Sequence, residues 1–431
     1  MSSAAGTTDP KLESWVPVPL DSDFPIQNLP FGLFTADGRV PSIGVAIGEY
    51  VLDCRAVAEA GCFDDCCEPE LLRASVLNPF LAAGREAWQA VRERLSLLLR
   101  ADGDARLRDT ADRFLRDRNA VTMLVPMEIG DYVDFYSSLE HATNLGRIFR
   151  PNADALLPNW RWLPVGYHGR SGTIVVDGTP VRRPRGQRKA ADALEPEFGP
   201  SRRLDIELEM GFVAGPGNEL GVPIDIDDVR AHIFGLVLVN DWSARDIQAW
   251  EYQPLGPFLG KSFATTISPW IVTLDALEPF RVESATQEPQ PLQYLLTDEP
   301  WAYEIELAVE LRTAEMSERE VPPVRISKTN FRDMYWSVAQ QLAHATVNGA
   351  LVRPGDLFAS GTISGKEPGT QGSLIELTWN GERPLELPGG ERRAFLEDGD
   401  EITLRGWCER RGARRIGFGR AGGRIEPASP A

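Results

Sequence analysis

The chain has 431 residues, of which 42% are hydrophobic, so it can form a substantial core in one large domain or two ordinary ones. Its 63 acidic side chains outnumber its 45 lysines and arginines and give a formal net charge of -18. A negative field of that size repels phosphate backbones and anionic membrane surfaces, which argues against nucleic acid or a membrane as a partner.

The N-terminal segment and the cysteines both indicate the compartment. Residues 1–14 are small and polar and contain no apolar stretch that could act as a signal peptide, so we expect a disordered leader there. The longest strongly apolar run, 233–239, is too short to span a bilayer. The five cysteines are odd in number and lack the C-x-x-C spacing of structural zinc sites, which favours reduced thiols and a cytoplasmic enzyme.

Two domains are expected. Residues 15–118 combine short apolar runs at 31–34 and 45–52 with helical patterns at 86–99 and 105–114, which predicts a small α+β unit. A charged, turn-like stretch at 116–120 marks the boundary. Strand-like runs dominate the rest of the chain, so residues 119–431 should form a second, mainly β domain; these runs include 172–176, 204–214, 233–240, 270–274, 301–311, 374–379 and 401–407.

Residues 131–150, DYVDFYSSLEHATNLGRIFR, predict a helix that carries a histidine in its first turn. Ser137 and Glu140 have the S-x-x-E spacing of a capping box, so the helix should cover about 138–146. His141 would then lie at the positive end of the helix dipole, which keeps the imidazole neutral and suits a general base. For a single histidine considered alone, a structural role is the simpler alternative.

The one basic run, RRPRGQRK at 182–189, contains proline and glycine and is followed by acidic residues. We interpret it as a solvated loop rather than as a nucleic-acid site.

Residues 204–210, LDIELEM, form the most informative strand. Strict alternation places Asp205, Glu207 and Glu209 on one face and apolar side chains on the other. Three like charges in a row repel each other, so they either face solvent on an edge strand or form a site for a hard cation such as Ca²⁺ or Mg²⁺. The strand alone leaves both alternatives open.

Residues 240–266 follow the buried apolar strand 233–239. If 241–252 is helical, Asp241, Arg245, Gln248 and Tyr252 share one stripe, although an ordinary surface ion pair explains the first two equally well. The glycines and prolines of PLGPFLGK hold the next stretch in a loop that brings 261–265 together.

Residues 356–376 carry a weaker signal. Gly361 and Gly365 bracket Thr362 in a tight turn whose amides and hydroxyl could face a carboxylate, but such turns are common. His344, shortly before this segment, lies in an apolar helical pattern without a nearby carboxylate cluster, and we expect it to be structural.

Together these segments resemble the fumarylacetoacetase family. The resemblance extends from SDFPIQNLPFGLF at 22–34 to GFGRAGG at 417–423 and includes DFYSSLEHATN, LPVGYHGR, RRPRGQ, LDIELEM, NDWSARDIQAWEYQPLGPFLGKSF and SGTISG in that order. It implies an N-terminal SH3-like barrel domain, a larger C-terminal domain of mixed β-roll architecture, and a homodimer.

The resemblance also implies roles for individual residues. The implied Ca²⁺ ligands are Asp134, Glu207, Glu209 and Asp241, and a second site with Mg²⁺ would involve Asp241, Lys261 through its backbone oxygen, and Thr265. His141 matches the general base and Glu376 the carboxylate that orients it, with Arg245, Gln248 and Lys261 as oxyanion donors. The implied substrate-binding residues are Tyr136, Arg150, Gln248, Tyr252 and Thr362. Asp205 is left without a role.

The reaction implied by the family is hydrolysis of a carbon–carbon bond in 4-fumarylacetoacetate, the last step of tyrosine and phenylalanine catabolism. A divalent cation would stabilise the enolate leaving group, and a water activated by His141 and Glu376 would be the nucleophile. Two alternatives remain. One is another reaction on the same C-terminal scaffold, such as acylpyruvate hydrolysis or oxaloacetate decarboxylation. The other is a catalytically silent calcium-binding protein.

Overall fold

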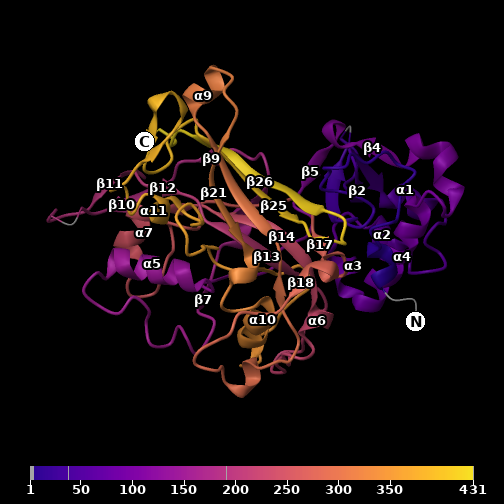
Figure 1. Ribbon diagram of the computed structural model, residues 1–431, viewed down its shortest axis with the longest axis horizontal. Helices are drawn as coiled ribbons and strands as arrows, with labels where there is room; N and C mark the ends of the chain where they lie inside the picture. Colours follow the sequence, from indigo (N-terminus) through magenta and orange to yellow (C-terminus); the bar gives the residue numbers. More distant parts are fainter. Residues whose placement is uncertain (1–3, 37, 191, 431) are drawn as a thin grey trace.

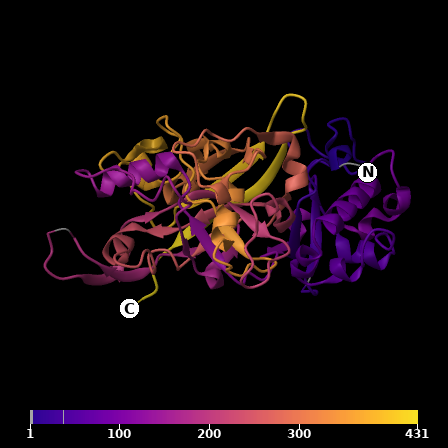
Figure 2. The ribbon, with the colours of Figure 1, turned by 90° about the horizontal axis from the view of Figure 1, so that it is seen from below.

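The computed structural model describes residues 4–36, 38–190 and 192–430 of the chain, which form two bodies side by side (Figure 1). The N-terminal third gathers on one side and the rest of the chain on the other, so the two termini lie at opposite ends (Figure 2). The fold is of the predicted α+β class, with strands dominating the second body.

The N-terminal body is built on a five-stranded antiparallel sheet of order β4-β3-β2-β1-β5. Its strands are β1 (Phe31–Thr35), β2 (Ser42–Ile47), β3 (Tyr50–Asp53), β4 (Leu115–Asp117) and β5 (Thr122–Leu124). Its helices are η1 (Ala4–Thr8), α1 (Cys54–Glu59), α2 (Glu70–Arg73), α3 (Asn78–Ala82), α4 (Arg85–Leu99), η2 (Ala105–Arg113) and η3 (Arg118–Ala120). The predicted strand at 31–34 and helix at 86–99 are confirmed as β1 and α4, and the helical pattern at 105–114 is the 3₁₀ helix η2.

The segment expected to be a disordered leader packs, from residue 4 onward, against α4. The guanidinium of Arg92, which is fully buried in α4, donates from Nε to the hydroxyl of Thr7 at 2.9 Å. Its other nitrogens donate to the carbonyls of Gln27 and Asn28 at 2.6 and 2.7 Å. Nε2 of Gln27 also donates to the carbonyls of Asp9 and Leu12. Polar side chains therefore help to join this segment to the domain, and the sequence contains no apolar pattern that predicts these contacts.

The second body contains two large sheets. The first has eight strands: β7 (Gly166–His168), β6 (Tyr132–Phe135), β22 (Leu357–Ala359), β13 (Leu208–Ala214), β14 (Ile233–Asp241), β16 (Thr265–Ile267) and β8 (Ile174–Val176), with β17 (Val272–Thr273) paired to β14. The second has five: β21 (Val324–Asn330), β20 (Glu306–Arg312), β25 (Glu401–Cys408), β26 (Ile416–Glu426) and β9 (Val181–Arg182).

Strand β14 lies at the centre of the molecule and is buried along its whole length. Leu236 and Leu238 pack into the core between the two large sheets, whereas Phe234, Val237 and Val239 pack against the core of the N-terminal body. Both faces are covered, which explains why the sequence of this strand is a continuous apolar run instead of an alternating one.

Short elements complete the second body. Four two-stranded ribbons pair β10 (Arg185–Arg188) with β11 (Glu197–Pro200), β12 (Leu204–Asp205) with β15 (Ser243–Ala244), β18 (Arg281–Val282) with β19 (Ala302–Tyr303), and β23 (Leu385–Glu386) with β24 (Arg392–Arg393). The helices are α5 (Leu139–Phe149), α6 (Val229–His232), α7 (Arg245–Glu251), α8 (Leu274–Leu277), α9 (Ala314–Glu318), α10 (Val338–Thr346) and α11 (Leu374–Leu377). Single 3₁₀ turns are η4 (Ser171–Thr173), η5 (Glu278–Phe280), η6 (Gln293–Leu295), η7 (Phe331–Asp333) and η8 (Pro388–Gly390).

Two local predictions are wrong. The apolar run at 374–379 is not a strand, because residues 374–377 form the short helix α11. The basic run at 182–189 is not a solvated loop either: it includes β9 and β10, and the guanidinium groups of Arg183 and Arg188 are mostly buried against backbone carbonyls and carboxylates. Among the described residues no helix has both the length and the apolar character needed to cross a membrane, and all five cysteines are free thiols.

Candidate active site

Four carboxylates meet at one end of the eight-stranded sheet. Asp134 lies on β6, Glu209 on β13, Asp241 ends β14, and Glu207 directly precedes β13. One ligand atom from each lies within 4.8 Å of all the others, and all four side chains are buried. These are the four residues that the family resemblance implies as Ca²⁺ ligands. Because none of them faces solvent, the alternative of a solvent-washed edge strand is excluded.

The free oxygens of this cluster fit a cation. Oδ1 of Asp134 and Oε1 of Glu209 are buried and accept no hydrogen bond from any described residue. Burial and the neighbouring carboxylates, with Asp241 the strongest for Asp134 and Asp134 the strongest for Glu209, raise the pKa of both groups well above its ordinary value. A buried site with four acidic groups and unsatisfied oxygens has the all-oxygen ligand set that hard divalent cations prefer.

Two cationic side chains border the cluster. The ammonium of Lys261 donates to Asp241 Oδ2 at 2.7 Å and also to Glu207, whose other oxygen lies 2.8 Å from Nη1 of Arg245. Burial alone would raise the pKa of Glu207, but these two cations outweigh it and lower that pKa. Thr265 faces Asp241 across the β14–β16 pair and donates its hydroxyl to Asp241 Oδ1 at 2.9 Å. Asp241, Lys261 and Thr265, the residues of the expected second cation site, therefore adjoin one another.

The stripe expected along a helix at 241–252 is only partly present. Asp241 belongs to β14, and α7 begins at Arg245, so these two residues do not share a helix face. Arg245 is paired instead with Asp205 and Glu207, at 2.8 Å each. On α7 itself, Nη1 of Arg245 donates to Gln248 Oε1 at 3.2 Å.

The structure joins His141 to Glu376. Nδ1 of His141 and Oε2 of Glu376 are 2.6 Å apart, and both side chains are almost completely buried. His141 lies in the first turn of α5, whose N-cap is Ser138 and not the Ser137 of the expected capping box. The hydroxyl of Ser138 accepts from the backbone N–H of His141 itself, at 3.3 Å, which fixes the start of the helix at that residue.

Glu376 is held by several donors in addition to His141. Its Oε2 accepts hydroxyl hydrogen bonds from Ser373 at 2.7 Å and Ser364 at 2.9 Å, and its Oε1 accepts from Asn144 Nδ2 at 3.0 Å. Burial alone would raise its pKa, but His141 and these hydrogen bonds together lower it. The carboxylate is thus fixed in place and charged, which orients Nδ1 of the imidazole toward it and leaves Nε2 for other contacts.

The expected substrate-binding residues approach this dyad to different degrees. Tyr136 stacks edge-on against the ring of His141, with centroids 5.3 Å apart. Burial raises the pKa of Tyr136. The nearby charges of Glu376 and Glu207 also raise it, whereas those of Arg150 and Arg245 lower it.

Thr362 and Tyr252 differ most in how far their side chains are exposed to solvent. The hydroxyl of Thr362 is buried and has no hydrogen-bond partner within the described ranges. Gly361, just before it, has a positive φ of 78° and donates its N–H to Glu209 Oε2 at 3.1 Å, so the turn does reach the acidic cluster. Tyr252, at the C-terminal end of α7, is 40% exposed, and its hydroxyl accepts a hydrogen bond from Gln253.

One residue near the carboxylates was missed by the sequence reasoning. The hydroxyl of Tyr167 donates to Asp134 Oδ2 and lies equally near Asp241 Oδ2, at 3.0 and 3.1 Å. Tyr167 also faces Asp134 across the β6–β7 pair. It lies in the LPVGYHGR motif, but only strand register, which the sequence does not give, places that tyrosine beside the cluster. With Asp241, Lys261 and Thr265 it lines a cavity of about 230 Å³.

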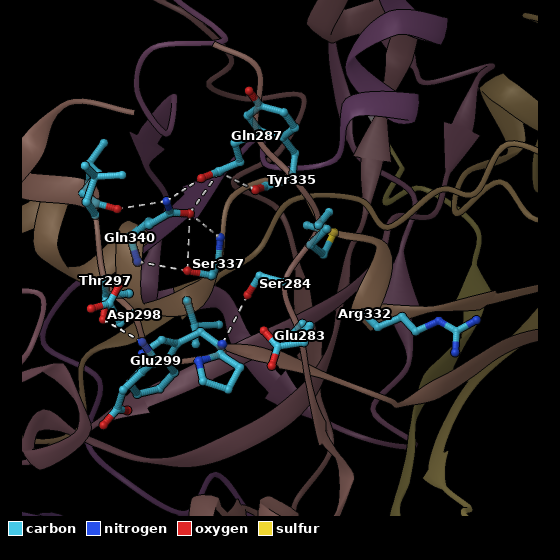
Figure 3. A pocket seen from close by; sticks show the side chains of 18 of the residues that line it. Glu283, Ser284, Gln287, Thr297, Asp298, Glu299, Arg332, Tyr335, Ser337 and Gln340 are labelled. Atoms are coloured by element: carbon cyan, nitrogen blue, oxygen red, sulfur yellow. Dashed lines mark hydrogen bonds between the residues drawn. The ribbon is translucent and has the colours of Figure 1, made fainter. Parts of the chain in front are cut away.

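A separate cavity of about 200 Å³ lies elsewhere in the second body (Figure 3). Gln287 and Gln340 exchange amide hydrogen bonds of 3.1 and 2.8 Å in its wall, and Ser337 joins the same network. None of the predicted catalytic, metal or substrate-binding residues lines it. The acidic cluster and the His141–Glu376 pair therefore define the candidate site, and this cavity does not.

Comparisons with known proteins agree along the whole chain. Residues 27–126 match the family described as fumarylacetoacetase N-terminal, and residues 132–425 match fumarylacetoacetate (FAA) hydrolase C-terminal. The chain is 51% identical to a fumarylacetoacetase of Arabidopsis thaliana over 425 residues, which are 97% of this chain and 99% of that protein. It is also 51% identical to a fumarylacetoacetase of Homo sapiens over 421 residues, 96% of this chain and 99% of that one.

A solved structure supports the fold at much lower identity. A fumarylacetoacetate hydrolase from Exiguobacterium antarcticum superposes with a TM-score of 0.51 at 18% identity, covering 92% of this chain and 99% of that one. That likeness concerns the fold alone. The matches to both domain models and the 51% identity over nearly the full length establish that the chain belongs to the fumarylacetoacetase family of hydrolases.

Proposed function

We propose that this chain hydrolyses the carbon–carbon bond of 4-fumarylacetoacetate to give fumarate and acetoacetate, the closing step of tyrosine and phenylalanine catabolism. The observation that carries the proposal is the buried 2.6 Å contact between His141 and Glu376, in a chain of this family that also gathers four buried carboxylates into one cluster. A base and a hard-cation site together are what hydrolysis of a β-diketo acid requires, since the leaving group is a carbanion unless its charge is stabilised.

His141 is the proposed general base. With Nδ1 bound to Glu376, its Nε2 accepts a proton from the attacking water, and the imidazolium that forms is stabilised by the buried carboxylate. Glu376 itself stays ionised and acts by fixing the tautomer and orientation of the ring, as the aspartate of a serine-protease triad does. The same imidazolium can return the proton to the leaving carbon, so no covalent acyl-enzyme is needed.

Arg245, Gln248 and Lys261 are the proposed donors to the tetrahedral oxyanion. Nη2 of Arg245 is buried and unpartnered within the described residues, although the other nitrogens of the guanidinium are fixed by carboxylates. Gln248 accepts from Arg245 through its Oε1, which leaves its amide N–H groups to donate elsewhere. Preorganised donors of this kind act on charge that develops only in the transition state.

Asp134, Glu207, Glu209 and Asp241 are proposed to hold Ca²⁺, and Asp241, the backbone oxygen of Lys261 and the hydroxyl of Thr265 to adjoin a second site for Mg²⁺. A cation bound there would act as a Lewis acid that stabilises the enolate of the departing acetoacetate. The unsatisfied oxygens of Asp134 and Glu209 support a cation at the first site.

Recognition of a dianionic substrate in a chain of net charge -18 requires local cations. Arg150 caps the C-terminal end of α5, the helix that carries His141, and its Nη2 donates to the carbonyl of Ala155 at 2.8 Å. Its Nε is buried and has no partner among the described residues, so it keeps a free donor. We propose that it binds a substrate carboxylate, with Tyr136, Gln248, Tyr252 and Thr362 completing the binding site.

Two further properties are proposed from family membership and composition. The chain is proposed to form a homodimer and to act in the cytoplasm. The division into an N-terminal domain at 15–118 and a catalytic domain at 119–431 stays a prediction, and β5 (Thr122–Leu124), just beyond that boundary, still belongs to the N-terminal sheet.

The nearest rival is another reaction on the same C-terminal scaffold. The test is a comparison of kcat/KM for fumarylacetoacetate, an acylpyruvate and oxaloacetate with purified, metal-loaded protein. We expect fumarylacetoacetate to be preferred by about 100-fold or more, because a site built for two terminal carboxylates leaves charged groups unpaired with a shorter substrate. Preference for either of the other substrates would replace the proposed reaction with that one. A silent calcium-binding protein would melt at a metal-dependent temperature and turn over none of the three.

A further inference from the structure

The predicted strand at 204–210 is interrupted at residues 206–207, between β12 and β13, and Asp205 is its one acidic residue outside the four-carboxylate cluster. Its side chain is completely buried, and its two oxygens accept four hydrogen bonds. Oδ2 accepts from Arg245 Nε at 2.8 Å and from the backbone N–H of Ile375 at 3.0 Å. Oδ1 accepts from the backbone N–H groups of Leu374 and Ile206, at 2.7 Å each. A buried carboxylate with a guanidinium and three amides as partners is a rigid junction between the elements that supply them.

One of those elements is α11, the helix that carries Glu376. Its N-cap residue, Ser373, makes no side-chain capping hydrogen bond, and its hydroxyl donates to Glu376. The first two helical N–H groups, on Leu374 and Ile375, would then lack partners inside the helix. Asp205 accepts both of them, so it caps α11 from a distant part of the chain and leaves Ser373 free to hold the catalytic carboxylate.

The other element is α7, through Arg245. Because a guanidinium is planar, fixing its Nε edge on Asp205 and its Nη1 on Glu207 sets the direction of the whole group. The remaining nitrogen, Nη2, is buried without a partner among the described residues and is the donor left for a ligand.

We propose that Asp205 is a positioning residue that holds Arg245 and the helix of Glu376 in one frame. Arg245, the proposed oxyanion donor, and Glu376, the partner of the proposed general base, then keep a fixed position relative to each other. This inference rests on the function proposed above, since it assigns to Asp205 an action through two residues of that reaction.

The first test is Asp205→Asn, which keeps the volume of the side chain. One carboxylate oxygen becomes an NH₂ group, so two of the four donors lose their acceptor. We expect kcat to fall about 100-fold while KM changes less than about threefold, because the loss concerns transition-state contacts. Asp400→Asn is the matched control: Asp400 is also completely buried and accepts from an arginine, Arg393, at 2.9 Å, but it lies outside the site. Its kcat should stay within about twofold of the parent.

A double-mutant cycle separates positioning from general destabilisation. If Asp205 acts through Arg245, the effect of Asp205→Asn on kcat should be at least about tenfold smaller when Arg245 is already alanine. Effects that simply multiply would overturn the proposal.

Amide hydrogen exchange tests the α11 part without any turnover. In Asp205→Asn the N–H groups of Leu374 and Ile375 should exchange at least about tenfold faster than in the parent, and in Asp400→Asn they should not. Unchanged exchange in Asp205→Asn would overturn the proposal, whether or not the chain cleaves fumarylacetoacetate. A parent chain with no turnover but with the expected exchange pattern would reject the proposed function alone.

If Asp205→Asn does not fold, Ser373→Ala takes its place in the exchange experiment. The proposal requires that the Leu374 and Ile375 amides stay protected in this variant, since Asp205 and not Ser373 caps them. Loss of their protection would show that Ser373 is the cap and would overturn the proposal.

Discussion

The imidazole of His141 and the carboxylate of Glu376 come from positions 235 residues apart and meet in a buried 2.6 Å contact. One lies in the first turn of α5 and the other in α11. In the proposed reaction this contact holds the general base against the group that orients it, as water activation needs.

Replacement of His141 by alanine should lower kcat about 1,000-fold and leave KM within about threefold, because the base acts in the chemical step. Steady-state kinetics on fumarylacetoacetate measure both parameters. His344→Ala is the control: this half-buried histidine on α10 contacts Tyr294 of η6, and its alanine variant should keep the parental kcat. A His141 variant that retains more than about a tenth of parental kcat would contradict the base assignment.

Replacement of Glu376 by glutamine should lower kcat by about 100-fold or more, because the amide cannot both accept from Nδ1–H and stabilise the imidazolium. Asn144→Ala removes only one donor to Glu376, on the oxygen that His141 does not use, so its loss should be about tenfold. The measurement is the kcat of the two variants, and the Glu376 variant should have the lower value. An Asn144 variant as impaired as the Glu376 variant would mean that the network acts as packing and not through the dyad.

Replacement of Arg150 by alanine should raise KM by roughly tenfold to a hundredfold with little change in kcat, as expected for loss of one charged hydrogen bond to the substrate. Arg147, an exposed arginine on the same helix, is the control, and its alanine variant should behave like the parent. Equal losses in kcat and KM for Arg150→Ala would place this residue in the chemical step instead.

The acidic cluster predicts how calcium and pH act together on stability. Asp134 and Glu209 have raised pKa values, so the metal-free folded state binds more protons than the unfolded chain from about pH 4 up through those values. Its free energy of unfolding should therefore fall as pH rises through this window. Glu207 and Glu376 have lowered pKa values and are ionised in both states above about pH 5, so they add no opposing slope there.

Calcium competes with those protons. Its effect on Tm should accordingly be larger at about pH 8 than at about pH 5. Thermal melts of chelated and calcium-loaded protein at both pH values measure this difference, with Glu209→Gln as a control in which the calcium effect shrinks. A calcium shift that is larger at the acidic pH would count against the cluster as the binding site.

The sequence predicts which residues form the site better than it predicts the strand pairing and hydrogen bonds that position them. The sequence could place three of the four clustered carboxylates, Glu207, Glu209 and Asp241, because each lies in or beside a strand whose apolar pattern is easily recognised. The structure brings them together with Asp134. Strand pairing places Tyr167 beside Asp134, and that register could not be read from either segment alone.

Glu376 illustrates the limit most clearly. The sequence predicts a strand for its segment, 374–379, because that run is short and apolar. In the structure residues 374–377 form a four-residue helix. The cap of that helix is Asp205, which lies 169 residues before Leu374. Local propensity cannot anticipate a helix whose first N–H groups are satisfied by a distant side chain. The same holds for residues 4–14, which side chains from distant parts of the chain, among them Arg92 and Gln27, join to the N-terminal domain.

The central claim is that this site cuts fumarylacetoacetate by cation-assisted hydrolysis. The most direct measurement is the amount of fumarate and of acetoacetate formed per fumarylacetoacetate consumed. It is made on three samples: the purified protein, the protein after chelation of its metal, and the chelated protein after Ca²⁺ is added back. The account predicts equal amounts of both products, loss of turnover on chelation, and recovery with the cation. A folded, calcium-loaded protein that forms neither product would contradict it.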